Sequence, residues 1–240
     1  VYTHVFDEQG KAPITKGAGG QFTHHRGIFI GWSKTKFSGR QVDSWHMKGC
    51  DQVYKKIINS TSTKDHATLT ILINWVTTDG VVFIEEKRTQ TFKRVEGEGA
   101  YLQVDFDTAL KAASADVELN GDPEHAGCQF RPSNEVSKNK SAKYIFHKDG
   151  LDLKKDKDLP WAAESFQIGE NMYFAQHMSH PTIPKGNTYS AYRDYGRFGA
   201  YFVKKIAKGD SLNLRYRYLV GNGKIPGREY FASRYKAFSN

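Results

Sequence analysis

The stretch from residue 66 to residue 94 constrains the fold more than any other part of the chain, because it has the pattern of a long β-hairpin. In residues 66–76 apolar side chains alternate with polar ones, so that Ile71, Ile73 and Trp75 share one face of an extended segment. Asp79-Gly80 follows, a dipeptide typical of hairpin turns, and residues 81–94 read as the returning strand. Long strands joined by a short turn are typical of large antiparallel sheets.

Other parts of the chain predict more strands of the same kind. We expect them at residues 2–6, 23–33, 101–108, 161–175, 201–204 and 211–220. Residues 107–115 are rich in alanine and leave a helix, a continued strand and an irregular turn open. The polar stretch 131–158 predicts a long surface loop. Aromatic residues at helical spacing predict a helix over 228–238.

No internal repeat and no linker rich in Pro, Gly or Ser divides the 240 residues. The sequence therefore predicts one domain over residues 1–240, an all-β fold in the form of a large antiparallel β-sandwich with a short C-terminal helix.

Charge and apolar runs indicate which partners to expect. The 35 basic residues outnumber the 26 acidic ones, giving a net charge of +9, but they are scattered and form no recognisable nucleic-acid module. No apolar run approaches the ~20 residues that cross a membrane. The start at Val1 has no signal-peptide pattern, although removal of a signal would leave such a start. We expect no nucleic-acid partner and no membrane span. For Cys50 and Cys128, free thiols and a disulfide both stay open.

Four clusters of polar and aromatic residues carry the candidate chemistry: residues 24–32, 45–48, 121–131 and 177–199. In an extended first cluster, His24 and Arg26 would share one face while His25 takes the other. Each cluster alone has a structural explanation, such as a local ion pair between Asp194 and Arg197. Together they suit a concave site that stacks a sugar ring on an aromatic side chain and hydrogen-bonds its hydroxyls.

The residues fall into two roles. The candidate catalytic acids and bases are His24, His25 and His125. The candidate substrate-binding residues are Arg26, Trp45, His46, Lys48, Gln129, Arg131, His180, Asp194, Tyr195 and Arg197.

Two chemistries compete for these residues. Histidine beside arginine suits proton abstraction next to a carbonyl, with the arginine stabilising an enolate or holding a carboxylate. Alternatively, three of the histidines 24, 25, 46, 125 and 180 could converge on a divalent metal ion, although no HExxH or His-x-His spacing supports a metal site. Glycoside hydrolysis would use two opposed carboxylates, for which Asp122, Glu124 and Asp194 are candidates that nothing in the sequence pairs.

Several strings of the chain resemble those of a bacterial family of uncharacterised proteins labelled methane-oxygenase-like. The matching strings are 13–16, 23–27, 122–131, 180–181 and 194–199. The pattern does not resemble a membrane-bound copper monooxygenase. Proteins of this kind are mostly exported and occur beside sugar oxidoreductases and glycan-degrading enzymes. The resemblance therefore implies a periplasmic or secreted protein of bacterial carbohydrate metabolism, with a fold similar to that of galactose mutarotase. It carries over no catalytic residues.

Our leading hypothesis is a carbohydrate-active enzyme, a lyase or hydrolase that acts on an oxidised or acidic sugar by histidine acid/base catalysis. A non-catalytic carbohydrate-binding module and a metal-dependent oxygenase are the alternatives. The sugar, the linkage, the metal and the oligomeric state stay open at this point.

Overall fold

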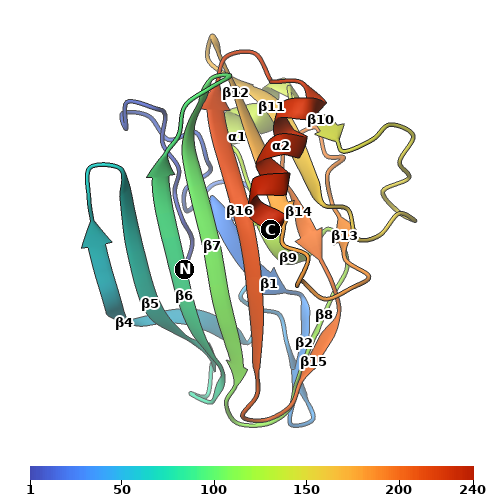
Figure 1. Ribbon diagram of the computed structural model, residues 1–240. Helices are drawn as coiled ribbons and strands as arrows, with labels where there is room; N and C mark the ends of the chain where they lie inside the picture. Colours follow the sequence, from blue (N-terminus) through green and yellow to red (C-terminus); the bar gives the residue numbers. More distant parts are fainter.

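The computed structural model describes residues 1–240 and consists mainly of antiparallel β-strands (Figure 1). Only two segments are α-helical, α1 (Asn134–Asn139) and α2 (Arg228–Ser239). The all-β fold class predicted from the sequence is confirmed, as is the C-terminal helix.

One sheet has eight strands in the order β10-β11-β12-β16-β7-β6-β5-β4. Their bounds are β4 (Cys50–Ser62), β5 (His66–Thr77), β6 (Val82–Arg94), β7 (Ala100–Ala112), β10 (Lys143–Phe146), β11 (Trp161–Ile168), β12 (Asn171–Ser179) and β16 (Ser211–Asn222). The predicted hairpin is confirmed as β5 and β6, with Gly80 at φ +89° in the turn. The alanine-rich segment after residue 107 continues strand β7.

Two further sheets have four strands each. One has the order β1-β9-β14-β13, with β1 (Ile28–Trp32), β9 (Ala126–Phe130), β13 (Thr188–Tyr189) and β14 (Phe198–Tyr201). The other has the order β15-β8-β2-β3, with β2 (Lys34–Phe37), β3 (Arg40–Val42), β8 (Val117–Asn120) and β15 (Lys204–Ile206).

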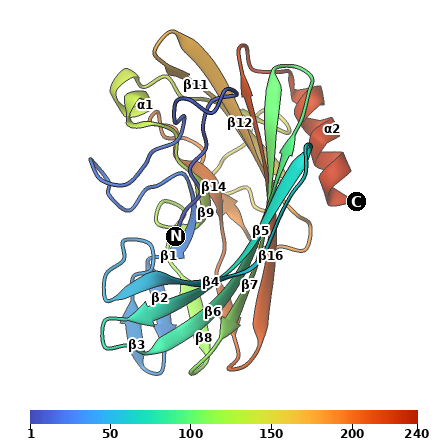
Figure 2. The same cartoon turned by 90° about the vertical axis from the view of Figure 1, so that its left-hand side faces the viewer.

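A core of 40 buried residues joins the large sheet to the two small ones. Ile28, Ile30 and Trp32 of β1 enter this core from one side, and Ile73 and Trp75 of β5 enter it from the large sheet. Because side chains alternate along a strand, Phe29 and Gly31 of β1 face away from this core. Figure 2 shows the large sheet between these small sheets and α2.

Helix α2 covers the outer face of the large sheet. Phe231 and Phe238 are buried and pack with Trp161 and Phe174 in a second, smaller core. The aromatic stripe predicted for this helix is thus a packing face.

The inner face of the large sheet also holds charge. Glu86 and Arg88 on β6 are fully buried and pair at 2.7 Å, with Trp75 Nε1 and Thr108 Oγ1 donating hydrogen bonds to the carboxylate. These bonds satisfy the carboxylate, as a buried ion pair requires.

Some sequence predictions were wrong in detail. Residues 2–6 form only isolated bridges, because they run beside β1 and the 13–15 segment without a regular ladder. The predicted loop 131–158 contains α1 and β10, and strand β4 was missed because it is a largely exposed edge strand with two bulges and no apolar alternation. The strands expected within 161–175, by contrast, are present as β11 and the first part of β12. Both cysteines are free and buried.

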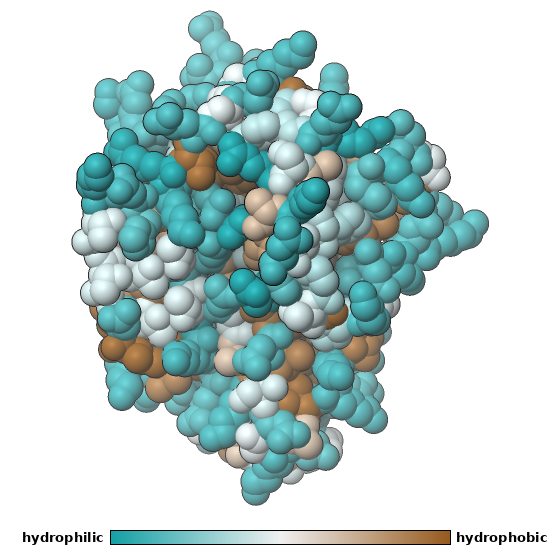
Figure 3. Space-filling model, in the orientation of Figure 1, coloured by the Kyte–Doolittle hydropathy of each residue, from teal (hydrophilic) through white to brown (hydrophobic).

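The surface agrees with the high content of charged residues. Figure 3 shows one face that is mostly hydrophilic, with apolar side chains confined to small areas. None of the helices has the length and apolar character needed to span a membrane.

Candidate functional site

The candidate site lies on the face of the β1-β9-β14-β13 sheet that points away from the main core. Phe29 of β1 pairs with Gln129 of β9, and Gln129 pairs with Gly199 of β14, so the three share one row across the sheet. The turn of residues 43–48 lies over this face and places Trp45 against Phe29, with ring centres 4.8 Å apart. Gly31 permits the close approach, since a Cβ there would lie 2.6 Å from Ser44 O.

Three histidine rings from three separate segments meet at the edge of this face. His24 precedes β1, His46 belongs to the turn before β4, and His125 precedes β9. The ring centres of His24 and His46 are 4.3 Å apart, and those of His46 and His125 are 5.3 Å apart. All three keep contact with solvent, so this is the reachable part of the site.

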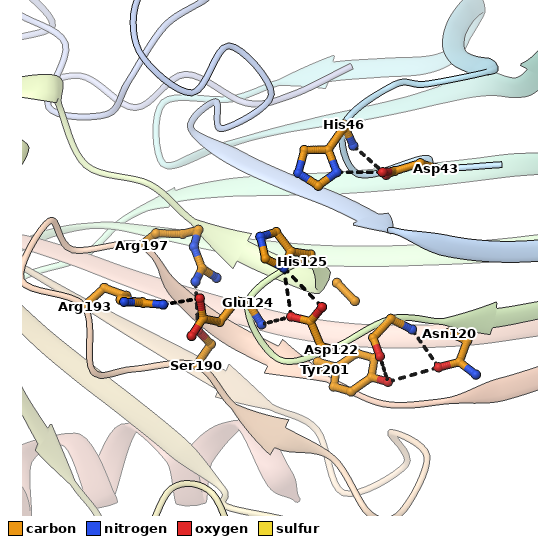
Figure 4. A network of polar contacts seen from close by, with 12 residues as sticks. Asp43, His46, Asn120, Asp122, Glu124, His125, Ser190, Arg193, Arg197 and Tyr201 are labelled. Atoms are coloured by element: carbon orange, nitrogen blue, oxygen red, sulfur yellow. Dashed lines mark hydrogen bonds and ion pairs between the residues drawn. The ribbon is translucent and has the colours of Figure 1, made fainter.

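Two of these rings are held by an aspartate three residues earlier in the chain. His46 Nδ1 lies 2.7 Å from Asp43 Oδ2, and His125 Nδ1 lies 2.9 Å from Asp122 Oδ1 (Figure 4). A carboxylate on Nδ1 favours the tautomer with its proton there, which leaves Nε2 free to accept a proton and then to pass it on. Both rings are therefore oriented for proton transfer.

The third ring is neutral at physiological pH. Burial, assisted by the neighbouring His46 and His125, lowers the pKa of His24 to about 4. A neutral imidazole next to two oriented ones can accept a proton.

His25 lies beneath this group and does not reach solvent. It is 4% exposed, and burial, followed by the charge of Arg197, lowers its pKa far below the ordinary value. Neither of its ring nitrogens has a hydrogen-bond partner, and neither does Nε1 of the buried Trp45. Unsatisfied buried polar atoms cost about 1–3 kcal/mol each, so their gathering here indicates a place where other polar groups bind.

Three cations lie under the same surface without an ionic partner. Lys16, Arg131 and Arg197 are 2%, 0% and 0% exposed, and none of them forms an ion pair. Glu164 is fully buried near Arg131, and burial raises the pKa of its carboxyl well above the ordinary range, which favours the uncharged form. Buried charges are normally paired, so the site has an excess of positive charge.

The hydrogen bonds of the two arginines show that they support the site from below. Arg131 donates to the carbonyl of Tyr195 and to Ser137 Oγ, and its guanidinium lies 4.9 Å from the Tyr195 ring. Arg197 donates to Gln129 Oε1 at 2.9 Å and to Ser190 Oγ at 3.0 Å. Both arginines thus hold Tyr195 in place, and their expected contact with substrate stays a prediction.

Two more residues that were predicted to bind substrate are buried. Trp45 is 1% exposed and Gln129 is 0% exposed, so in this conformation neither reaches the surface. His24 and Arg26 were expected on one face of a strand with His25 on the other. Instead, residues 22–25 form a turn in which His25 N donates a hydrogen bond to Phe22 O. The ring centres of His24 and His25 lie 4.2 Å apart.

The structure gathers most of the predicted site residues but not all of them. Brought together are His24, His25, Trp45, His46, His125, Gln129, Arg131, Tyr195 and Arg197. His180 lies apart, between Arg215 and Phe238 of helix α2. Asp194 is exposed and faces Lys140, Lys48 is exposed, and Arg26 lies over Tyr2.

Sequence reasoning missed several residues of the site, namely Lys16, Phe22, Asp43, Tyr192 and Arg193. One signal was present: Asp43 and His46 have the same Asp-x-x-His spacing as Asp122 and His125. Glu124 forms an ion pair with Arg193 and accepts a hydrogen bond from Tyr192 Oη at 2.9 Å. The three carboxylates considered for glycoside hydrolysis thus each have a histidine or a cation as partner.

A shallow groove of about 290 Å³ adjoins this cluster, lined by Asp122, Glu124, Lys154, Lys157 and Tyr192 among others. Two larger clefts, of about 720 and 830 Å³, are lined by none of the predicted site residues. The chemistry of the side chains, and not cavity size, selects this surface. No three or more His, Cys, Asp or Glu side chains are placed to hold a common metal ion, so the structure offers no geometry for the divalent ion considered above.

Comparison with known proteins places the chain in a family. Residues 1–235 match the family of unknown function DUF6807, and the chain belongs to that family. The match supplies no activity and supports neither the methane-oxygenase-like label nor a link to sugars. No curated protein matches the chain.

The similar solved structures are distant. A heparan sulfate lyase from Pedobacter heparinus aligns with a TM-score of 0.41 and 10% identity, over 91% of this chain and 30% of that one. A mutant of that lyase aligns with a TM-score of 0.41 and 8% identity, over 81% and 24%. An α-galactosidase from Lactobacillus brevis gives 0.43 and 9%, over 92% and 33%. The chain thus spans at most a third of their length, and similarity at this level carries no conclusion about activity.

Proposed function

We propose that this protein is a carbohydrate-active enzyme, a lyase or hydrolase that acts on an oxidised or acidic sugar by histidine acid/base catalysis. The observation that carries the proposal is a neutral histidine, flanked by two aspartate-held histidines, above buried cations that have no ionic partner. These parts meet the two needs of proton abstraction next to a carbonyl, a base and a positive field for the enolate or carboxylate.

The roles follow from exposure and partners. His24 is neutral and reachable, so we assign it the base, a weak one because its pKa is low. His125, whose Nδ1 is held by Asp122, suits the acid: in its protonated form it donates from Nε2 to a leaving oxygen and keeps the Nδ1 proton on the aspartate side. His25 was predicted to be catalytic, but its burial restricts it to the floor of the site in this conformation. Lys16, Arg131 and Arg197 supply the positive field.

The test is turnover of a panel of glycosides. It should contain uronic-acid and keto-sugar glycosides with matched neutral glycosides, and products should be identified by mass spectrometry. We expect turnover of anionic or oxidised members only, and we expect His125→Ala to abolish it while the circular dichroism spectrum is unchanged. His66→Ala is the matched control, because His66 is exposed and its ring contacts only Thr63.

Unchanged turnover in His125→Ala would refute the catalytic assignment. Glycan binding without turnover, surviving loss of the histidines, would favour the carbohydrate-binding module instead. The burial of Trp45 speaks against that alternative, because a 1% exposed ring cannot serve as a stacking platform. A bacterial periplasmic or secreted location, with a role in glycan degradation, belongs to the same proposal.

A further inference from the structure

Phe22 covers the buried part of the site from the solvent side. Phe22 is 41% exposed, which is unusual for a large aromatic residue. The ring stacks on Tyr195 at 6.0 Å with an interplanar angle of 28°, and its centre lies 5.4 Å from that of His25 and 6.3 Å from that of His24. Phe22 therefore sits among the rings of the site without being part of the core.

The backbone at Phe22 is strained. Its φ is +53°, in the left-handed region that a bulky residue rarely adopts, and such a conformation costs about 1–3 kcal/mol unless its surroundings enforce it. Strain of this kind concentrates at ligand clamps and switch regions.

The segment before Phe22 is rich in glycine and is held by one side chain. Gly19 and Gly20 both have positive φ, and the backbone carbonyls of Gly17 and Gly19 are held by Lys16 Nζ, at 3.1 Å and 2.7 Å. The ammonium of Lys16 thus ties the glycine-rich segment to the cationic floor. A ligand that competes for this ammonium would release the segment.

Polar atoms next to Phe22, and behind its neighbour His25, lack partners. Both ring nitrogens of His25 and Nε1 of Trp45 are buried without a hydrogen bond. A phenyl ring can cover these groups but cannot bond to them, whereas a sugar ring offers hydroxyl groups to all three.

We propose that Phe22 is a lid residue whose ring occupies a ligand subsite, and that a sugar ring with an anionic substituent takes its place when the glycine-rich segment opens. The stack on Tyr195 accommodates the ring, the unsatisfied nitrogens bond its hydroxyls, and Lys16 with Arg131 and Arg197 attracts the anionic group. The nature of the ligand rests on the proposed function, whereas the lid itself does not.

The lid is tested by the chemical accessibility of His25. Diethyl pyrocarbonate modifies unprotonated imidazoles that it can reach, and mass spectrometry locates the modified histidine. In the wild type His25 is neutral but covered, so we expect slow modification. In Phe22→Ala we expect modification of His25 to be at least about tenfold faster, which corresponds to about 1.4 kcal/mol in the free energy of local opening.

His177 is a built-in control for unfolding. Like His25 it is neutral and buried, with 0% exposure. Its ring packs against Tyr189, Tyr216 and Tyr218 and not against the lid. It should stay unmodified in both proteins. Phe22→Asn is a second variant, since asparagine tolerates positive φ and so removes the ring without adding strain.

The outcomes separate cleanly. If His25 is modified no faster in the two variants than in the wild type, Phe22 is not a lid. If both variants also expose His177, Phe22 is a structural residue and the proposal is wrong.

A second arm tests the ligand class with D-glucuronate and D-glucose at equal concentration. We expect glucuronate to slow the modification of His25 in Phe22→Ala and glucose to have no effect. Equal protection by both sugars, or protection by neither, would refute an anionic-ring subsite. Turnover is not measured in either arm, so failure here is distinguishable from failure of the acid/base proposal.

Discussion

The imidazole rings of His46 and His125 lie 5.3 Å apart, and each has an aspartate on its Nδ1. The two pairs come from different turns, one before β4 and one before β9. Each aspartate sets the orientation and the tautomer of its ring, so the two rings present Nε2 as the working nitrogen. Replacing either aspartate should therefore impair proton transfer by its histidine.

Replacing Asp122 with Asn should lower kcat by about 10²-fold or more, because His125 loses the carboxylate that holds its Nδ1 proton. Turnover of the sugar identified in the glycoside panel is the measurement. Asp65→Asn is the matched control, since Asp65 is exposed and its carboxylate has no hydrogen-bond partner. An Asp122→Asn enzyme as fast as the wild type would show that the pair plays no part in proton transfer.

Lys16→Met should remove anion binding, because it removes the ammonium group while a methionine fills the space of the aliphatic part of the lysine side chain. In the wild type we expect D-glucuronate to raise Tm, because a ligand that binds only the folded state stabilises it. In Lys16→Met we expect this rise to be lost, without a large change in Tm in the absence of anion, since an unpaired buried charge stabilises little. Lys64→Met, at an exposed lysine, should respond like the wild type. Equal rises in all three proteins would argue against the cationic floor as the binding site.

Stability should fall in acid because of the buried His177. Burial lowers the pKa of His177 to about 3, whereas in the unfolded chain it is about 6.5. Its contribution to stability is therefore complete above pH 6.5 and is lost as the pH falls toward 3, because the unfolded chain binds the proton first. The free energy of unfolding should decrease by up to about 1.4 kcal/mol per pH unit from this residue.

Urea unfolding at several pH values between 7 and 4 would check this. His177→Phe should show a shallower dependence on pH, and His66→Phe, at an exposed position, should keep the wild-type dependence. An unaltered slope in His177→Phe would contradict the assignment of acid lability to this buried ring.

Gly127→Ala should destabilise the sheet that carries the site. A Cβ at Gly127 would lie 2.0 Å from Ala200 O on the neighbouring strand, and φ there is +91°. We expect a loss of more than about 2 kcal/mol in the free energy of unfolding. Gly227→Ala is the control, with φ −70° and no atom within 4 Å of an added Cβ. Equal stability of the two variants would contradict the close packing of β9 on β14.

Much of the scaffold was predictable because it depends on local patterns. The period-two runs identified β5, β6, β7 and β16, and aromatic spacing identified α2. The edge strand β4 was not predictable in this way, because an edge strand with an exposed face needs no apolar alternation. Its pairing with β5 is a matter of backbone hydrogen bonds, which sequence patterning does not reveal.

For the site, residue type was predictable and role was not. Most of the predicted histidines, arginines and aromatics do meet, yet Arg131, Arg197 and Trp45 are buried beneath the surface they were expected to form. Contacts between distant segments decide this, such as Arg131 with Tyr195 and Arg197 with Trp45, and no local spacing encodes them.

The sequence by itself determined the all-β class, the terminal helix and the residues that could do acid/base chemistry, because these depend on side-chain period and intrinsic chemistry. The tertiary structure alone decided which of them reach solvent, which cations are left without partners, and that Phe22 covers His25. The physical reason is that burial and electrostatic environment arise from contacts between segments far apart in the chain, such as His24, His46 and His125.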